Sequence, residues 1–179
     1  MKKNLIVYSS VTGNTRKVAE AIAEVFGETA DLFSVETAPP ADAYDFVAVG
    51  FWVDRGTADK KAEPYLRTIH DKKVGLFATL GAYPDSEHAA KSMANAAALL
   101  AADNELVGTF ICQGKVTPRL ADKFKNLPPD HPHAMTPERE ARHREAAKHP
   151  DANDLKQAQS IFDGIRQQLA GSAAPAGGA

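Results

Sequence analysis

The sequence lacks the features that would direct a protein to the cell exterior, a membrane or nucleic acid. Its single cysteine, Cys112, cannot form a disulfide within the chain, which fits a reducing cytoplasm. After the first lysines, the apolar run 5–8 is too short for a signal peptide or a membrane span. Lysine and arginine number 21 against 23 acidic residues, so no basic field exists for nucleic acid. We therefore expect a cytoplasmic protein without nucleic-acid or membrane partners.

Short apolar runs, rich in residues that favour strands, recur along the chain. Such runs are typical of strands that are covered on both faces. They occupy residues 5–8, 46–51, 74–80 and 106–112. A weaker run at 30–35 alternates apolar and polar residues, which predicts a fifth strand near solvent.

Helical periodicity fills the intervals between these runs. A helix is expected from about Asn14 to Phe26, and Gly27 follows where a left-handed C-cap would lie. Others are expected at about 62–70, at about 86–102 and, as a closing helix, at about 155–169. Alternating strands and helices require right-handed crossovers, so the fold class is α/β with a doubly wound parallel sheet of five strands.

The pattern breaks after Cys112 into a polar stretch with several prolines and a charged run, 138–145, that predicts an exposed helix. We expect a single domain at 1–170, with an insert at about 113–150 and a disordered tail at 171–179. The insert holds the pair His131 and His133, but no cysteine or acidic cluster completes a metal site by its spacing, so a solvated loop is favoured.

The most informative segment directly follows the first strand and opens the first helix. It reads Ser10-Val11-Thr12-Gly13-Asn14-Thr15. A glycine that allows close approach, exposed backbone N–H groups and the positive end of a helix dipole together favour an anion. The segment lacks the lysine of a Walker A loop and the three glycines of a dinucleotide fingerprint, so a terminal monophosphate suits it best.

This segment matches the motif S/T-x-T-G-N-T at every defined position, and it resembles the phosphate loop of the flavodoxin family. The resemblance implies strand order 2-1-3-4-5 and one FMN bound without a covalent bond. It also implies two further flavin loops, after the third and fourth strands. Trp52 and Tyr83 are the expected ring-covering residues of these loops. The expected cofactor-binding residues of the two loops are Gly50, Phe51, Trp52, Val53, Asp54, Gly56, Leu80, Gly81, Ala82 and Tyr83.

The resemblance implies a protein that transfers electrons through FMN, without catalytic acids or bases of its own. Flavodoxins that serve as general carriers are markedly acidic, whereas acids and bases nearly balance here. We therefore expect a dedicated redox partner, either a reductase or an electron acceptor, and the insert as a docking element or lid. The alternatives are an NAD(P)H-dependent FMN or quinone oxidoreductase and a flavin-free interaction module. No motif for a nicotinamide pocket is visible, which favours the carrier.

Overall fold

A parallel sheet of five strands forms the centre of the computed structural model, which describes residues 3–172. The strand order is β2-β1-β3-β5-β6, which confirms the predicted doubly wound sheet. A short strand, β4, adds an antiparallel pairing to β3 that the sequence did not predict. The strands are β1 (Asn4–Tyr8), β2 (Ala30–Ser34), β3 (Phe46–Asp54), β4 (Thr57–Ala58), β5 (Lys73–Leu80) and β6 (Glu105–Gln113).

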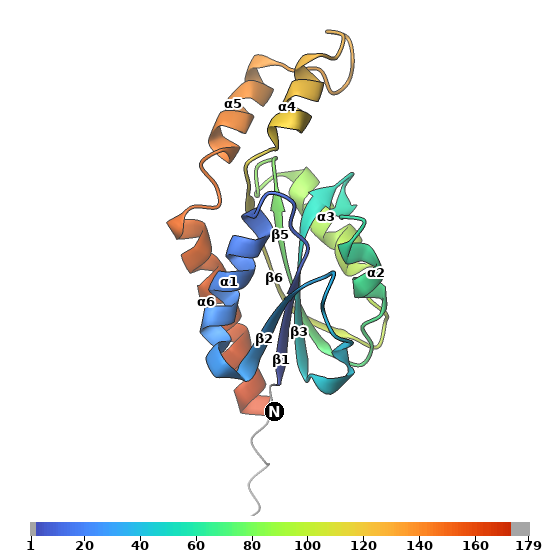
Figure 1. Ribbon diagram of the computed structural model, residues 1–179, viewed down its shortest axis with the longest axis vertical. Helices are drawn as coiled ribbons and strands as arrows, with labels where there is room; N and C mark the ends of the chain where they lie inside the picture. The colour runs from blue at the N-terminus through green and yellow to red at the C-terminus, as the bar shows by residue number, and fades with distance from the viewer. Residues whose placement is uncertain (1–2, 173–179) are drawn as a thin grey trace, which may run out of the picture.

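Helices cover both faces of the sheet, α1 and α6 on one side and α2 and α3 on the other (Figure 1). The helices are α1 (Asn14–Phe26), α2 (Ala62–Arg67), α3 (Glu87–Ala97), α4 (Pro118–Lys125), α5 (Pro137–Ala146) and α6 (Ala152–Ser172). Short 3-10 turns occur at Gly27–Thr29 and Ala41–Ala43. None of the helices in residues 3–172 is long and apolar enough to cross a membrane.

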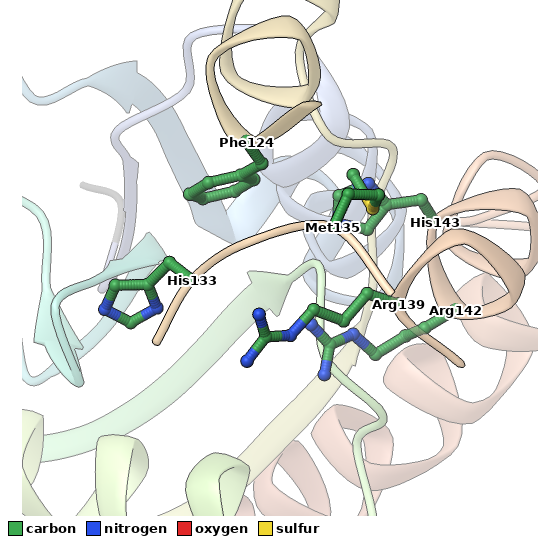
Figure 2. Close-up of a pocket in the computed structure, with 6 residues that line it drawn as sticks. All are labelled: Phe124, His133, Met135, Arg139, Arg142 and His143. Carbon is green, nitrogen blue, oxygen red and sulfur yellow. The ribbon is translucent and has the colours of Figure 1, made fainter. Parts of the chain in front are cut away.

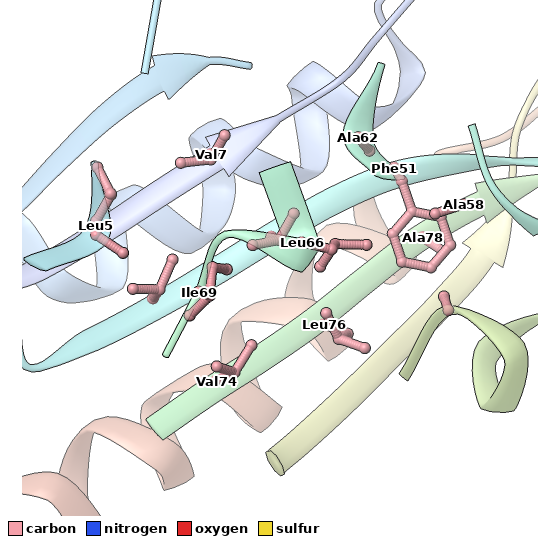
Figure 3. Packing of buried hydrophobic residues seen from close by; sticks show 14 of the residues in the cluster. Leu5, Val7, Phe51, Ala58, Ala62, Leu66, Ile69, Val74, Leu76 and Ala78 are labelled. Atoms are coloured by element: carbon pink, nitrogen blue, oxygen red, sulfur yellow. The ribbon is translucent and has the colours of Figure 1, made fainter. Parts of the chain in front are cut away.

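The core divides into two clusters because neighbouring residues of a strand point to opposite faces. In β1, Leu5 and Val7 pack in the cluster under α2, which Figure 3 shows with Leu66 and Leu76. Ile6 lies between them and packs in the other cluster, under α1 and α6. All these side chains are fully buried, so the sheet is covered on both faces, as the continuous apolar runs predict.

Helix ends follow local chemistry, with departures from the prediction. The helix α1 ends at Phe26, and the φ of 54° at Gly27 suits glycine, but its ψ of −135° lies outside the left-handed helical region that was expected for the cap. The helices α2 and α3 end earlier than predicted, at Arg67 and Ala97. After Ala97 the chain tightens into i→i+3 turns, and the side chain of Asn104 binds the carbonyls of Ile69 and Ala101. The i→i+3 turns and the hydrogen bonds of Asn104 take the place of further α-helical hydrogen bonds.

The predicted loop after the third strand is a continuation of that strand, which corrects the expectation for residues 50–54. Val53 and Asp54 pair with β4 across a turn at Arg55 and Gly56, both at positive φ (51° and 79°). Such a two-residue turn matches the twist of antiparallel strands, so it closes a hairpin that a strand count from apolar runs does not detect.

Residues 114–151, named here the helical insert, hold α4 and α5 and project beyond the carboxyl ends of the strands (Figure 1). The helix α5 lies where the charged run predicted one. The helix α4 was not predicted, although Thr117 accepts a bond from the amide of Leu120 and Pro118 takes the first helical position. The helix α6 extends to Ser172, two residues into the predicted tail, and residues 173–179 lie outside the described range.

Candidate functional site

The loop 10–15 lies at the carboxyl end of β1. The chain goes from β1 to β2 on one side of it and then crosses to β3 on the other side, so the strand order reverses here. In open α/β sheets, ligands bind outside the carboxyl ends of the strands where the strand order reverses. The loop predicted from sequence therefore stands at the position where this fold places a ligand.

The first turn of α1 leaves backbone donors without partners. The hydroxyl of Ser10 accepts from the amides of Gly13, at 3.1 Å, and Arg16, at 3.4 Å. Among residues 3–172, no acceptor is found for the amides of Thr12, Asn14 or Thr15. The N-cap residue Gly13 supplies no side-chain bond, and the first turn holds no acidic residue, so the positive end of the helix is open to an anion.

Gly13 makes this geometry possible through its backbone. Its φ is 89°, in the left-handed region that side-chain-bearing residues rarely adopt. A Cβ there would meet nothing within 4 Å, so the glycine is required by conformation and not by crowding.

The loop is braced from two sides. Thr15 is buried, and its Oγ1 lies 2.9 Å from Oγ1 of Thr79, near the end of β5. The amide nitrogen Nδ2 of Asn14 donates to the carbonyl of Lys115, at the root of the helical insert, at 3.0 Å. Thr12 is exposed and stays available to a ligand.

Asp59 is a functional-site candidate that the sequence analysis missed. Its carboxylate is 1% exposed and accepts four hydrogen bonds. The donors are Ser9 Oγ (2.8 Å) and the amides of Trp52 (3.3 Å), Lys61 (3.0 Å) and Ala62 (3.3 Å). An aspartate three residues before the first residue of α2 is a local capping pattern that would have drawn attention to it. Its bonds join Ser9, just before the loop 10–15, to β3, the strand that bears Trp52.

The two expected ring-covering residues both lie at the carboxyl edge. Trp52 is half-buried in the extension of β3, and its Nε1 is buried without a hydrogen-bond partner in residues 3–172. Tyr83 follows β5 and is 43% exposed. The turn at Gly56 is held to α3 because Nδ2 of Asn95 donates to the Gly56 carbonyl at 2.8 Å.

Gly50 and Phe51 lie deeper than the predicted loop placed them. A Cβ on Gly50 would stand 2.0 Å from the ring of Phe77, and its carbonyl accepts from the amide of Ser9. The side chain of Phe51 is fully buried in the core beside Ala58 (Figure 3). Both side-chain positions therefore belong to the packing of the sheet.

The other residues predicted for the two flavin loops lie at or just after the ends of β3 and β5. Val53 and Asp54 end β3 and are half-buried. Leu80 ends β5 and is 6% exposed, with Ala82 half-buried just after it. Gly81 packs closely on the insert, since a Cβ there would lie 2.6 Å from Cγ2 of Val116.

A buried amide group at the end of β6 adds to the donors of this edge. Gln113 is 4% exposed, and its Nε2 has no acceptor in the described part of the chain. Buried polar groups are normally paired, so the unpaired donors of Trp52 and Gln113 are available to the acceptors of a polar ring. Together with the open amides of the loop, these residues fit a flat, polar cofactor with one anionic group.

The histidine that the structure places beside acidic residues is His149, and not His131 or His133, the pair considered in the sequence. His149 lies beside Asp151 and Asp154, with its Nδ1 2.5 Å from an oxygen of Asp154. Asp151 and Asp154 also exchange bonds between carboxylates and amides, which is a reciprocal cap at the start of α6. The hydrogen bonds within this cluster therefore join the end of α5 to the start of α6. The hydrogen bond to Asp154 raises the pKa of His149.

Cys112 lies near the end of β6 and is 2% exposed. Burial raises the pKa of its thiol far above the usual value, and the nearby charges of Asp154 and Asp151 act in the same direction. The thiolate, which is the reactive form, is therefore strongly disfavoured.

Comparison with known proteins assigns the class. Residues 5–163 match the model of the flavodoxin domain, and the chain therefore belongs to the flavodoxin family. It is 36% identical over 167 residues to the flavodoxin-like domain-containing protein BilS of Clostridioides difficile, covering 89% of this chain and 93% of that protein. Identity to the protein of the same description from Clostridium symbiosum is 28% over 171 residues, covering 86% and 90%.

Solved structures share the fold at low sequence identity. Oxidised flavodoxin 2 of Bacillus cereus is 19% identical with a TM-score of 0.61, covering 93% of this chain and 99% of that one. A flavoprotein of Lactobacillus acidophilus, in complex with FMN, is 16% identical with a TM-score of 0.50, covering 70% and 100%. These similarities show the fold, and the strand order above agrees with them.

Proposed function

We propose that the protein binds one FMN without a covalent bond at the carboxyl edge of the sheet and passes electrons through it to a dedicated redox partner. The observation that carries the proposal is the loop 10–15, whose unpaired amides at the start of α1 face the ligand position of the fold. Membership of the flavodoxin family supports flavin binding there.

The phosphate group is assigned to the loop. The amides of Thr12, Asn14 and Thr15 donate to its oxygens, and the hydroxyl of Thr12 adds a further donor. Ser10 shapes the loop through its own bonds to Gly13 and Arg16, and Val11 is exposed at its tip. This short loop then has to neutralise the charge of one monophosphate group only.

The flavin ring is assigned to the edge between β3 and β5. Trp52 and Tyr83 cover its faces, and backbone groups from 53–56 and 80–82 meet its rim. Bound flavin supplies the redox chemistry, while the chain orients the ring and limits water around it. Asp59 acts through others, because it holds Ser9 and Trp52 in place without reaching the edge itself.

A dedicated partner is favoured over general electron transport. The net charge is −2, so the chain lacks the strong acidic field that attracts many basic partners without selection. The helical insert instead stands at the edge where the flavin is assigned (Figure 1). Recognition by shape and by specific contacts is what such an insert provides.

Replacing Thr12 by aspartate tests the proposal. Thr12 is exposed, so the fold should survive, but a carboxylate at this place repels the phosphate and caps the same amides. We expect FMN to bind at least about tenfold more weakly, equal to about 1.4 kcal/mol. The measurement is quenching of FMN fluorescence on titration with the apoprotein.

The charge-matched control is Ser160→Asp, on the exposed side of α6. It adds the same charge away from the loop and should bind FMN as the original chain does. If Thr12→Asp bound FMN as tightly as this control, the phosphate assignment would be wrong. If the original chain bound no FMN, the flavin-free interaction module would take its place.

A further inference from the structure

The helical insert contributes little to the core and differs in charge from the rest of the chain. Of residues 115–151, only Ala134 and Ala146 are buried apolar residues. The insert holds eight lysines and arginines against six acidic residues, whereas the rest of the chain has 13 against 17. A segment that adds no core and reverses the charge is suited to recognition.

A cavity of about 220 Å³ opens between α4, α5 and the loop that joins them (Figure 2). Its apolar wall is formed by Phe124 and Met135. The ring of Phe124 lies between two imidazoles, with centroids 6.4 Å from that of His133 and 6.2 Å from that of His143. Arg139 and Arg142 extend from α5 on its other side (Figure 2).

These two arginines differ from all others in the chain. Of the eight arginines, Arg139 and Arg142 are half-buried and the other six are exposed. Arg16, Arg67 and Arg166 each pair with an acidic neighbour on their own helix. Within residues 3–172, no carboxylate lies within 4 Å of the guanidinium of Arg139 or Arg142.

Their roles can be separated. Arg139 donates to the carbonyls of Ala134 and Pro132, so it holds the loop against α5. The Nε of Arg142 is buried and has no acceptor in the described part of the chain. A buried charged donor without an acceptor is unfavourable unless another group supplies one. Burial and the charges of Arg142 and Lys125 lower the pKa of His143, which agrees with a positive potential in the cavity.

We propose that this cavity receives an acidic side chain of the redox partner, with Arg142 as the anchor for its carboxylate. The inference rests on the proposed function for the nature of that partner. The cavity is smaller than the roughly 300–1,000 Å³ of sites that enclose whole small molecules, so it suits one side chain. The guanidinium offers a planar, two-pronged match to a carboxylate, and arginine is enriched among the residues that contribute most to binding at interfaces.

The insert that carries this anchor is attached at the edge where the flavin is assigned. The carbonyl of Lys115 accepts from Asn14 of the phosphate-type loop, and Val116 packs on Gly81 of the loop after β5. A partner held at Arg142 is thereby held on a segment attached to the edge where the flavin is assigned. Short separation between redox groups is what a docking contact has to achieve.

The test uses the full chain, labelled with ¹⁵N, and a blocked hexaglutamate peptide as the probe. We expect a saturable NMR shift of the Arg142 Nε–H signal and of the amides of Met135 and His143. Arg142→Gln should weaken peptide binding about tenfold, as expected for a charge-assisted bond. The matched control is Arg144→Gln, an exposed position on the same helix, which removes the same charge and should keep most of the affinity.

Four results would overturn the inference. They are the absence of a saturable shift, equal weakening by Arg142→Gln and Arg144→Gln, equal binding of a hexaglutamine peptide, and tighter binding of inorganic phosphate than of the peptide. FMN absorbance in the same samples separates the two proposals. A chain that binds the peptide but no FMN contradicts the proposed function alone, and one that binds FMN but no peptide contradicts this inference alone.

Discussion

Asp59 shows how one residue joins two parts of the candidate site. A buried carboxylate is costly unless hydrogen bonds replace its water, and here four donors do so. Two of them are Ser9, directly after β1, and Trp52, in β3. The relative position of these two strand ends therefore depends on one buried carboxylate.

His149 gives a prediction at the same scale. It joins the last turn of α5 to the first turn of α6 through Asp154, with Glu145 3.4 Å from its other ring nitrogen. The bond to Asp154 raises the pKa of His149 above the ordinary 6.5. Protonated His149 therefore stabilises the fold fully below that value, and this contribution is lost as the pH rises through the raised pKa.

We expect His149→Gln to flatten the pH dependence of the free energy of unfolding as the pH rises from the ordinary value of 6.5 through the raised pKa of His149, measured by urea titration. Glu145 and Asp151 have lowered pKa values, so their contributions change only in acid, outside this window. The control is His88→Gln, at an exposed position of α3. A dependence unchanged in His149→Gln but altered in His88→Gln would contradict the assignment.

Among the elements, the pair α4 and α5 is the one least integrated with the sheet. Its two roots are joined directly, because the amide of Lys115 donates to the carbonyl of His149 at 3.2 Å. The chain thus leaves the body and returns to it at nearly the same point. An insert with this geometry can be added to or removed from a fold without moving the strands around it.

Replacing residues 116–148 by two glycines tests this independence. With two buried alanines lost, we expect a cost of about 1–2 kcal/mol. This corresponds to a fall in Tm of roughly 2–8 °C, measured by circular dichroism. FMN should stay bound, and electrons should reach the redox partner more slowly. An unfolded product would show that the insert is part of the core, and unchanged electron delivery would exclude a docking or lid role.

Over the whole molecule, the two ends of the sheet differ in character. The open amides, the unpaired Trp52 and Gln113 donors and the helical insert all lie at the carboxyl end. A larger cavity, of about 730 Å³, lies at the amino end, between residues such as Lys3, Asp71 and Leu169. Since ligands of such sheets bind at the carboxyl ends, size alone does not make the larger cavity the site.

Direct reduction by nicotinamide cofactors separates a carrier from an oxidoreductase. In anaerobic stopped-flow mixing of the FMN-loaded protein, we expect NADH or NADPH to bleach the flavin absorbance only when a reductase is added. The reason is that the sequence has no motif for a second pocket to hold a nicotinamide. Fast bleaching by NADH or NADPH alone would identify the protein as an oxidoreductase instead.

The sequence by itself determined the five parallel strands, the five helices other than α4, and the segment 10–15 that follows β1. These are local features, because an apolar run, a capping glycine and a strand-loop-helix segment are each contiguous in the chain. The extension of β3, the Ser9–Asp59 bond across 50 residues and the cavity beside Arg142 were decided only by the tertiary structure. The Ser9–Asp59 bond joins groups that meet only once the sheet has packed. The β3–β4 hairpin and the cavity form within short stretches of chain, but they depend on backbone pairing and helix packing that a pattern of apolar residues does not record.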